Sequence, residues 1–265
     1  MNDDVFLWGD FGAAEMHSLA QSCKDVVGYS RLGEILNANI DPHAWYGGIA
    51  FEGGMSWQDV MKHPKKKTIR NKAKPVNFGL GGGMGPDKWV TFARVQYGQV
   101  FTRAEAVHYK NLWFSLLPEV KELQAWVNGL LGGGQFCTVV LPRGGLVAGG
   151  KRYCAACNIT FQAPTAMGAK QALLMVMIAT LTEGSPLYGY TLWNFVHDEI
   201  CLRGPRDLDR LVPAARELRR IMVQEFTAFC PDYPTDVELS AGTAWSKDAP
   251  VFDVDKPRVW EYRQA

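Results

Sequence analysis

The sequence predicts an α+β fold, and three observations lead to this prediction. Residues 5–9 read as a short buried strand, 191–203 read as two apolar strands around a His-Asp turn, and 236–240 read as a last strand, so the predicted strands lie far apart along the chain. Long segments with helical signals separate them. The chain shows no internal repeat, low-complexity segment or persuasive linker, and the mixture of strands and helices favours the α+β class.

The helical segments are recognised by their starts and stops. Pro42 follows Asp41, which suits a helix beginning at Pro42. Thr102 and Glu105 form a capping box, which predicts a helix over 103–115. Further helices are expected at 13–21, 65–80, 87–97, 118–131, 151–183 with a kink at Pro164, and from Pro205 to about 229; 81–86 reads as a loop and 132–145 as turn, strand and turn.

The composition is ordinary for a globular protein. The 265 residues are 47% hydrophobic and 21% charged, with a net charge of +1, which suffices for one large domain or two small ones. Because the net charge is nearly zero, any nucleic-acid binding must come from a local patch, and 62–74 is the obvious one. No apolar run is long enough to cross a bilayer, and the acidic N-terminus does not resemble a signal peptide.

The six cysteines show no disulfide framework, so reduced thiols in a cytoplasm are expected. Cys154 and Cys157 form one CxxC pair. A zinc ribbon needs a second such pair, which the sequence lacks. These two residues are therefore interpreted as thiols one helical turn apart.

The stretch 65–83 carries the strongest local signal. Arg70, Lys74 and Phe78 are spaced four apart, so a helix would present a guanidinium, an ammonium and an aromatic ring in a row. Two cations in line suit a polyphosphate, and a ring beside them suits a base or sugar. The alternative is a solvated basic face or a general nucleic-acid patch. Pro75 inside the run predicts a kink.

Two aspartates could form a second site. Asp10 ends the first apolar strand, and Asp198 sits at the tip of the 191–203 hairpin, after a His in a turn that disfavours it. If those strands are neighbours, the carboxylates converge and suit Mg²⁺ and phosphoryl or nucleotidyl transfer. A capping Asp and a turn Asp are the ordinary readings. Periodicity alone does not bring residues 10 and 198 together.

Three motifs in order resemble the polymerase core of family A DNA polymerases, the bacterial polymerase I and bacteriophage type. Residues 10–17 (DFGAAEMH) resemble the family's D-Y-S-x-I-E-L-R motif. Residues 70–79 resemble its R-x3-K-x3-[FY]-G fingers helix, and 196–199 (VHDE) resemble its palm hairpin. Shorter matches are 41–43 to D-x-H, 158–162 to N-x3-Q and 242–245 to G-x-x-W.

The resemblance implies template-directed DNA synthesis with two Mg²⁺ ions. Asp10, Asp198 and the carbonyl of Phe11 would hold the metals. Arg70 and Lys74 would neutralise the triphosphate of a dNTP, with Lys74 also catalytic. The remaining implied roles are nucleotide binding by Glu15, which favours deoxynucleotides, by His43 and by Phe78, and primer–template contact by Asn158, Gln162, His197 and Glu199.

The resemblance also implies a division of the chain. Residues 1–40 would be the first part of a palm, 41–150 the fingers, 151–248 the second part of the palm, and 249–265 a C-terminal tail. In the family, the thumb, the first palm elements and the exonuclease domain all precede the motif that begins at Asp10. We therefore expect the C-terminal subunit of a split polymerase, with Met1 as a true start and a partner chain supplying the thumb, in the cytoplasm of a bacterial or phage-infected cell.

Departures from the family pattern keep alternatives open. The family usually has a Tyr where Gly82 stands, and an Arg where Cys154 stands, although Arg152 lies close. One alternative is a catalytically incompetent nucleic-acid-binding or assembly fragment of the same fold. Another is a stand-alone Mg²⁺-dependent phosphotransferase using the GGGMG loop at 81–85, which lacks the G-K-[ST] ending of a phosphate-binding loop.

Overall fold

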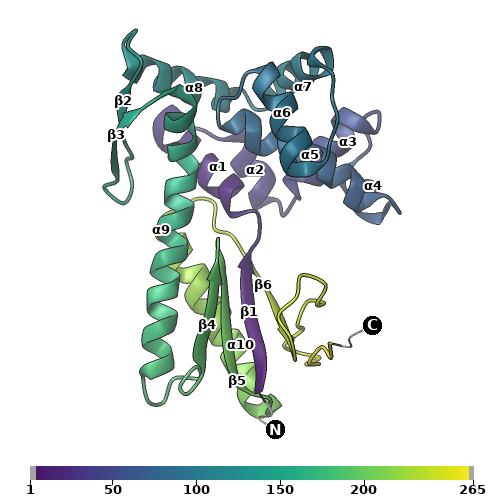
Figure 1. Cartoon of the computed structure of the whole chain (residues 1–265), viewed down its shortest axis with the longest axis vertical. Helices are drawn as coiled ribbons and strands as arrows, with labels where there is room; N and C mark the ends of the chain where they lie inside the picture. Colours follow the sequence, from purple (N-terminus) through teal and green to yellow (C-terminus); the bar gives the residue numbers. More distant parts are fainter. Residues whose placement is uncertain (1–3, 263–265) are drawn as a thin grey trace. The chain divides into compact units, whose positions relative to one another are not determined.

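The computed structural model describes residues 4–262 and divides into two compact units (Figure 1). The sheet unit combines the N-terminal segment up to Ala14 with the segment from Thr165 onward, and the helical unit comprises Glu15–Pro164. The fold is α+β, as predicted. These units change over at 14/15 and 164/165, whereas the expected palm and fingers boundaries lie at 40/41 and 150/151.

The sheet unit is built on four antiparallel strands in the order β4-β5-β1-β6. The predicted hairpin is confirmed, because β4 and β5 are joined by a two-residue turn. The first strand pairs with β5 on one side and β6 on the other (Figure 1). The bounds are β1 (Asp4–Phe11), β4 (Thr191–Val196), β5 (Glu199–Pro205), β6 (Val237–Gly242) and helix α10 (Leu208–Thr227).

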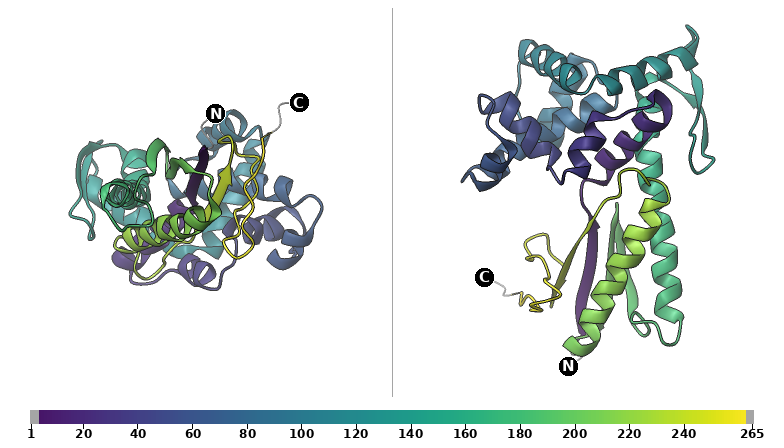
Figure 2. Two further views of the ribbon diagram at one scale, coloured as in Figure 1. Left: turned by 90° about the horizontal axis from the view of Figure 1, so that it is seen from below. Right: turned by 180° about the vertical axis from the view of Figure 1, so that it is seen from behind.

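The core of the sheet unit lies between the sheet and α10, which runs along β1 and β6 (Figure 2). Gly9 in β1 permits the close approach of α10 and β6 to this strand. A Cβ at position 9 would lie 2.7 Å from the sulfur of Met222 and 2.9 Å from Cγ1 of Val237. Two residues after Gly9, Phe11 of β1 packs against Phe226 of α10, with ring centroids 5.0 Å apart. The strand that carries Asp10 is therefore fixed from one face by α10.

The C-terminal tail packs back on β6. The Phe252 N–H donates to the Leu239 carbonyl (2.7 Å) and the Trp260 N–H donates to the Ala241 carbonyl (2.9 Å). Trp260 also forms a parallel bridge with Gly242. Residues 249–262 thus cover the outer edge of β6, while 263–265 of the expected tail lie outside the described residues.

The helical unit contains most of the helices. Those predicted from caps are present, including the capping box of Thr102 and Glu105; α2 and α4 were not predicted. β2 lies in the segment expected to hold a strand and pairs with β3, which was not predicted. The bounds are α1 (Ala14–Val27), α2 (Arg31–Asn37), α3 (Pro42–Phe51), α4 (Trp57–Lys62), α5 (Lys66–Gly81), α6 (Pro86–Tyr97), α7 (Arg103–Leu116), α8 (Pro118–Leu131), β2 (Cys137–Val140), β3 (Val147–Lys151) and the first part of α9 (Tyr153–Leu181).

Helix α3 packs against α4 and α5 through two glycines. A Cβ on Gly47 would lie 2.7 Å from Cγ2 of Ile69, and one on Gly48 would lie 2.2 Å from the carbonyl oxygen of Met55. A carbonyl oxygen cannot move aside as a flexible side-chain end can. This close packing fixes the N-terminus of α3 beside α5, where several predicted site residues lie.

Two predicted boundaries were wrong. The first strand does not end at Asp10 but continues to Phe11, so Asp10 lies inside β1 and keeps its ladder partner in β6. The helix expected from Pro205 begins at Leu208 instead. Pro205 ends β5, and the Asp207 side chain caps the helix by accepting from the N–H of Asp209.

Helix α9 runs without a break from Tyr153 to Leu181, with Pro164 inside it. The division between the two units falls at this proline. The expectation that no apolar run could cross a bilayer needs correction, because α9 alone among the helices of residues 4–262 is long and apolar enough. This finding rests on length and composition only, and the core helix of a globular protein passes the same test.

Candidate functional site

The sheet unit places the two predicted aspartates at one end of its sheet. The β1–β5 register pairs Gly9 with Ile200, so Asp10 comes beside the residues at the tip of the β4–β5 hairpin. That tip is the two-residue turn of His197 and Asp198. His197 has a φ of 58°, in the left-handed region that few non-glycine residues adopt. The register thus supplies the proximity that sequence periodicity could not.

The two carboxyl groups influence each other electrostatically. Burial raises the pKa of Asp10, partly offset by the ammonium of Lys247. Burial, and after it the negative charge of Asp10, raise the pKa of Asp198 to about 6. Two carboxylates that each resist ionisation form a site that a cation would stabilise.

Lys247 supplies such a cation from the protein itself. Its Nζ lies 2.7 Å from Oε2 of Glu199 and 3.5 Å from Oδ2 of Asp10. The Glu199 side chain is only 3% exposed and also accepts a hydrogen bond from the indole N–H of Trp245. Both oxygens of Glu199 are therefore occupied within the protein. We did not identify Lys247 from the sequence, although it lies two residues after the G-x-x-W match.

The available ligands fit a magnesium site with few protein donors. Among residues 4–262 no group of three or more His, Cys, Asp or Glu side chains could hold a metal. Asp10 and Asp198 offer carboxylate oxygens, and Phe11, whose carbonyl is the third predicted ligand, is the last residue of β1. Mg²⁺ prefers such oxygen ligands and keeps waters and substrate phosphates in the rest of its shell.

The helical unit holds the predicted nucleotide-binding residues. Arg70 on α5 forms an ion pair with Asp41, the N-cap of α3 (2.7 Å). The Nε of Arg70 is buried and has no hydrogen-bond partner among the described residues. An unsatisfied buried donor on a cation is a natural contact for an anionic ligand.

His43 and Phe78 meet beside that arginine, with ring centroids 5.3 Å apart. Burial, together with the charges of Arg70 and Lys74, lowers the pKa of His43 to about 4, against the opposing effect of Asp41. His43 is therefore neutral at pH 7. The α5 face and the N-terminus of α3 thus bring His43, Arg70 and Phe78 together, and Lys74 lies close enough to affect the same imidazole.

Asn77 orients this imidazole and was not predicted. Its Nδ2 lies 2.8 Å from Nδ1 of His43, and its Oδ1 accepts from the indole N–H of Trp113 (2.9 Å). Because Oδ1 is occupied, Nδ2 acts as the donor and Nδ1 as the acceptor. The His43 proton therefore lies on Nε2. A buried amide on this helix has no sequence signal that separates it from any other helical Asn.

The remaining predicted residues are Glu15, Asn158 and Gln162 of the helical unit and His197, which precedes Asp198 in the hairpin turn. Glu15 is half-buried in the first turn of α1, and its charge adds to the effect of burial in raising the pKa of Tyr97. Asn158 fills the space beside Gly82, where a Cβ would lie 2.5 Å from its Oδ1. Gln162 and His197 are exposed. The Tyr expected by the family pattern at position 82 could be accommodated only if Asn158 moved.

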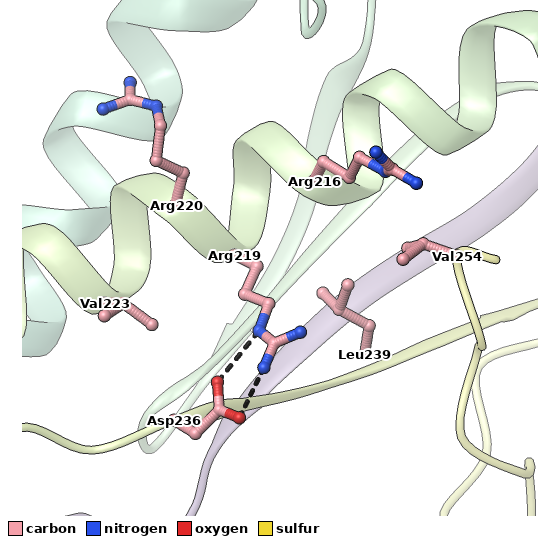
Figure 3. A pocket seen from close by; sticks show the side chains of 7 residues that line it. All are labelled: Arg216, Arg219, Arg220, Val223, Asp236, Leu239 and Val254. Carbon is pink, nitrogen blue, oxygen red and sulfur yellow. Dashed lines mark hydrogen bonds and ion pairs between the residues drawn. The ribbon is translucent and has the colours of Figure 1, made fainter.

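A cavity of ≈370 Å³ between α10, β6 and the tail is rich in arginine (Figure 3). Each of the three guanidinium groups nevertheless forms an ion pair with a carboxylate. Arg219 binds Asp236 through two hydrogen bonds, and the other pairs are Arg216 with Asp255 (2.8 Å) and Arg220 with Glu217 (2.7 Å). Arg216 and Arg219 tie α10 to the tail and to the start of β6, whereas Arg220 pairs within α10 itself, and the cavity is not a cationic site open to an anion.

Comparisons with known proteins agree with this fold. No known protein-family profile matches the sequence, and no curated protein matches it. Among solved structures, the chain is similar to the POL domain of Pol1 from M. smegmatis, in complex with DNA primer-template and dNTP, with a TM-score of 0.64 and 20% sequence identity. The match covers 91% of this chain and 40% of that one. The chain therefore has a DNA polymerase-like fold and spans well under half the length of that polymerase chain.

Proposed function

We propose that this chain carries out template-dependent nucleotidyl transfer from a dNTP to a primer 3′-hydroxyl, as a family A type DNA polymerase catalytic fragment. The observation that carries the proposal is the position of Asp10 and Asp198, which the β1–β5 register and the β4–β5 turn bring to one sheet end. The negative charge of Asp10, which contributes to the raised pKa of Asp198, supports it. In this proposal the sheet unit is the palm and the helical unit the fingers.

The two units have separate tasks in the reaction. In the palm, Asp10, Asp198 and the Phe11 carbonyl hold the cations and orient the primer end. Two Mg²⁺ ions, when bound there, lower the pKa of the primer hydroxyl and stabilise the leaving pyrophosphate. The hydroxyl oxygen forms a bond to the α-phosphorus as the bond to pyrophosphate breaks. In the fingers, Arg70 and Lys74 bind the triphosphate.

The other fingers residues position the nucleotide. The Nε atom of half-buried Arg70 is itself buried and has no hydrogen-bond partner among the described residues, which supports an anionic partner for this side chain. Neutral His43 would offer its Nε2 proton as a hydrogen-bond donor, and the ring of Phe78, which contacts His43, would stack on the incoming nucleotide. Glu15 favours deoxynucleotides. We assign primer–template contact to Asn158, Gln162, His197 and Glu199. Glu199 would act indirectly, through Trp245 and Lys247, which it binds.

We also propose that a second polypeptide supplies the thumb and the first palm elements. An exposed apolar stripe supports this idea, since Leu174, Met177, Ile178 and Leu181 follow helical spacing on the sheet-unit part of α9 and are 42–78% exposed. Trp193 of the edge strand β4 is 53% exposed. A junction between two parts of one polymerase would be large and apolar, like a domain core cut in two.

Primer extension tests the proposal. The chain is assayed with Mg²⁺, dNTPs and a primed template, alone and with the product of the neighbouring gene. Asp10→Asn and Asp198→Asn should each abolish extension. Asp4→Asn is the matched control, because Asp4 begins the same strand, about 20 Å from Asp10, and pairs with Arg203 (3.0 Å).

Each outcome has a definite meaning. Extension by the wild-type chain and by Asp4→Asn, but not by the other two variants, supports the catalytic assignment. Extension that survives both Asp10→Asn and Asp198→Asn refutes it. DNA binding without extension under either condition favours the incompetent nucleic-acid-binding fragment. Nucleotide hydrolysis without primer–template would instead favour the stand-alone phosphotransferase.

A further inference from the structure

The helical unit contains a cavity of ≈590 Å³ that the proposed function does not use. Helices α7 and α8 and the first residue of α9 line it; we call it the α7–α8 pocket. Its volume falls in the range of roughly 300–1,000 Å³ typical of small-ligand sites. Each helix contributes one side, because the lining positions recur at spacings of three and four residues.

The lining combines rings, amides and cations. Phe114 and Tyr153 provide aromatic surface, and Asn128 provides an amide that can donate and accept. Lys110 lies over the Phe114 ring, 5.8 Å from its centroid. Lys121 forms no ion pair or hydrogen bond with any residue in 4–262. These groups match a flat heterocycle with polar edges that is joined to a phosphate.

Gln124 makes the floor of the pocket rigid. Its side chain is 93% buried and donates to the carbonyls of Leu80 (2.6 Å) and Gly81 (3.2 Å) at the C-terminal end of α5. The Tyr153 hydroxyl in turn donates to Gln124 Oε1 (3.4 Å). Both donors of the amide are used within the protein, so the pocket is tied to the helix that carries Arg70.

We propose that the α7–α8 pocket binds an unpaired nucleotide of single-stranded DNA by stacking and amide contacts, with Lys121 on the adjoining phosphate. Sequence-tolerant binding of single strands uses this combination of aromatic platforms and cations. Naming the strand as template rests on the proposed polymerase function. The binding itself does not depend on that function, because none of the pocket residues belongs to the proposed catalytic groups.

Photocrosslinking to the full chain tests the pocket directly. The reagent is a fluorescein-labelled dT12 with one 5-iododeoxyuridine, irradiated in EDTA without dNTPs, and crosslinks are mapped by mass spectrometry. We expect a crosslink on Phe114 or Tyr153. Crosslinks confined to residues outside α7, α8 and the start of α9 would overturn the proposal.

Anisotropy with labelled dT12 adds a matched comparison. Lys121→Gln and Asn128→Ala should each weaken binding about fivefold or more, whereas Lys88→Gln, an exposed lysine on α6, should change it less than about twofold. Equal losses for the two lysine variants would mean general charge attraction and would refute the site. All three positions are at the surface, and a circular dichroism melt checks folding.

Competition separates a strand from a free nucleotide. If dTMP displaces dT12 at concentrations near the oligonucleotide's own Kd, the pocket is a mononucleotide site and the single-strand proposal is wrong. If dTMP fails at a thousandfold excess while unlabelled dT12 competes, the proposal holds. Because every arm lacks Mg²⁺ and dNTPs, a failure here is distinct from a failure of Asp10 and Asp198 to support extension.

Discussion

Replacement of Lys247 by Met should strengthen divalent-metal binding at the proposed palm site. The Lys247 ammonium lies 3.5 Å from Asp10 Oδ2 and 2.7 Å from Glu199 Oε2. The ammonium therefore places a positive charge beside Asp10, where a bound metal ion would also lie. A metal ion must approach Asp10 against this positive charge, and methionine removes the charge while keeping a chain of similar length.

The size of the effect follows from the Asp10–Lys247 separation. Lys247 is 66% exposed, so solvent screening applies and a water-like dielectric is the suitable choice. At 3.5 Å, Coulomb's law then gives about 1 kcal/mol for the ion pair. Removal of the competing ammonium should raise metal affinity by up to about tenfold.

Mn²⁺ titration followed by electron paramagnetic resonance measures this affinity without any catalysis. Lys256→Met is the control, since Lys256 is an exposed lysine in the tail of the same unit. The Lys247→Met variant should also unfold at a lower temperature, because buried Glu199 would keep only its bond from Trp245. Mn²⁺ binding that is unchanged in Lys247→Met would refute the reasoning. Weakened binding would also refute it and would show that Lys247 supports the site through Glu199.

Three further predictions concern stability. Because burial and the neighbouring carboxylate raise the pKa of Asp198 to about 6, the folded chain binds this proton more tightly than the unfolded chain; without metal, the free energy of unfolding should fall as pH rises from about 4 to about 6. Chemical denaturation at several pH values checks this, and the slope should shrink in Asp198→Asn. Gly48→Ala should cost about 2 kcal/mol or more through its clash with the Met55 carbonyl, whereas Gly129→Ala, where no atom lies within 4 Å, should be neutral or stabilise α8 by about 0.5–1 kcal/mol; equal effects would contradict the packing argument. Asn77→Ala should cost about 1–3 kcal/mol in a urea melt, since it strips a buried indole N–H and a buried imidazole of their partners.

Much of the fold could be predicted from local signals. Strand and helix positions followed from apolar runs and caps, and the order of the short motifs indicated a polymerase-like architecture. The contact between Asp10 and the hairpin carrying Asp198 could not be derived in this way. It depends on pairing between β1 and β5 across most of the chain, and nothing in the period of either strand specifies its neighbour.

Supporting residues were missed for a related reason. Asn77 and Lys247 act by holding His43, Glu199 and Asp10, and their residue types are common on protein surfaces. Only the three-dimensional structure distinguishes a buried amide with three partners from a solvent-facing one. Similarly, Gly82 departs from the family pattern, and the structure adds that Asn158 fills the space it leaves.

The carboxylate pairing of the α10 arginines has a consequence for the ionic strength dependence of the proposed nucleic-acid binding. Arg216, Arg219 and Arg220 are already neutralised by acidic side chains, so they release few counterions when DNA binds. The exposed lysines at 62 and 65–67 form no ion pair among the described residues and remain open to phosphate. If the chain binds single strands as proposed, the slope of log K against log salt, about 0.7 per phosphate contact, should decrease on removal of Lys121 or of these lysines, and should change little on removal of the α10 arginines.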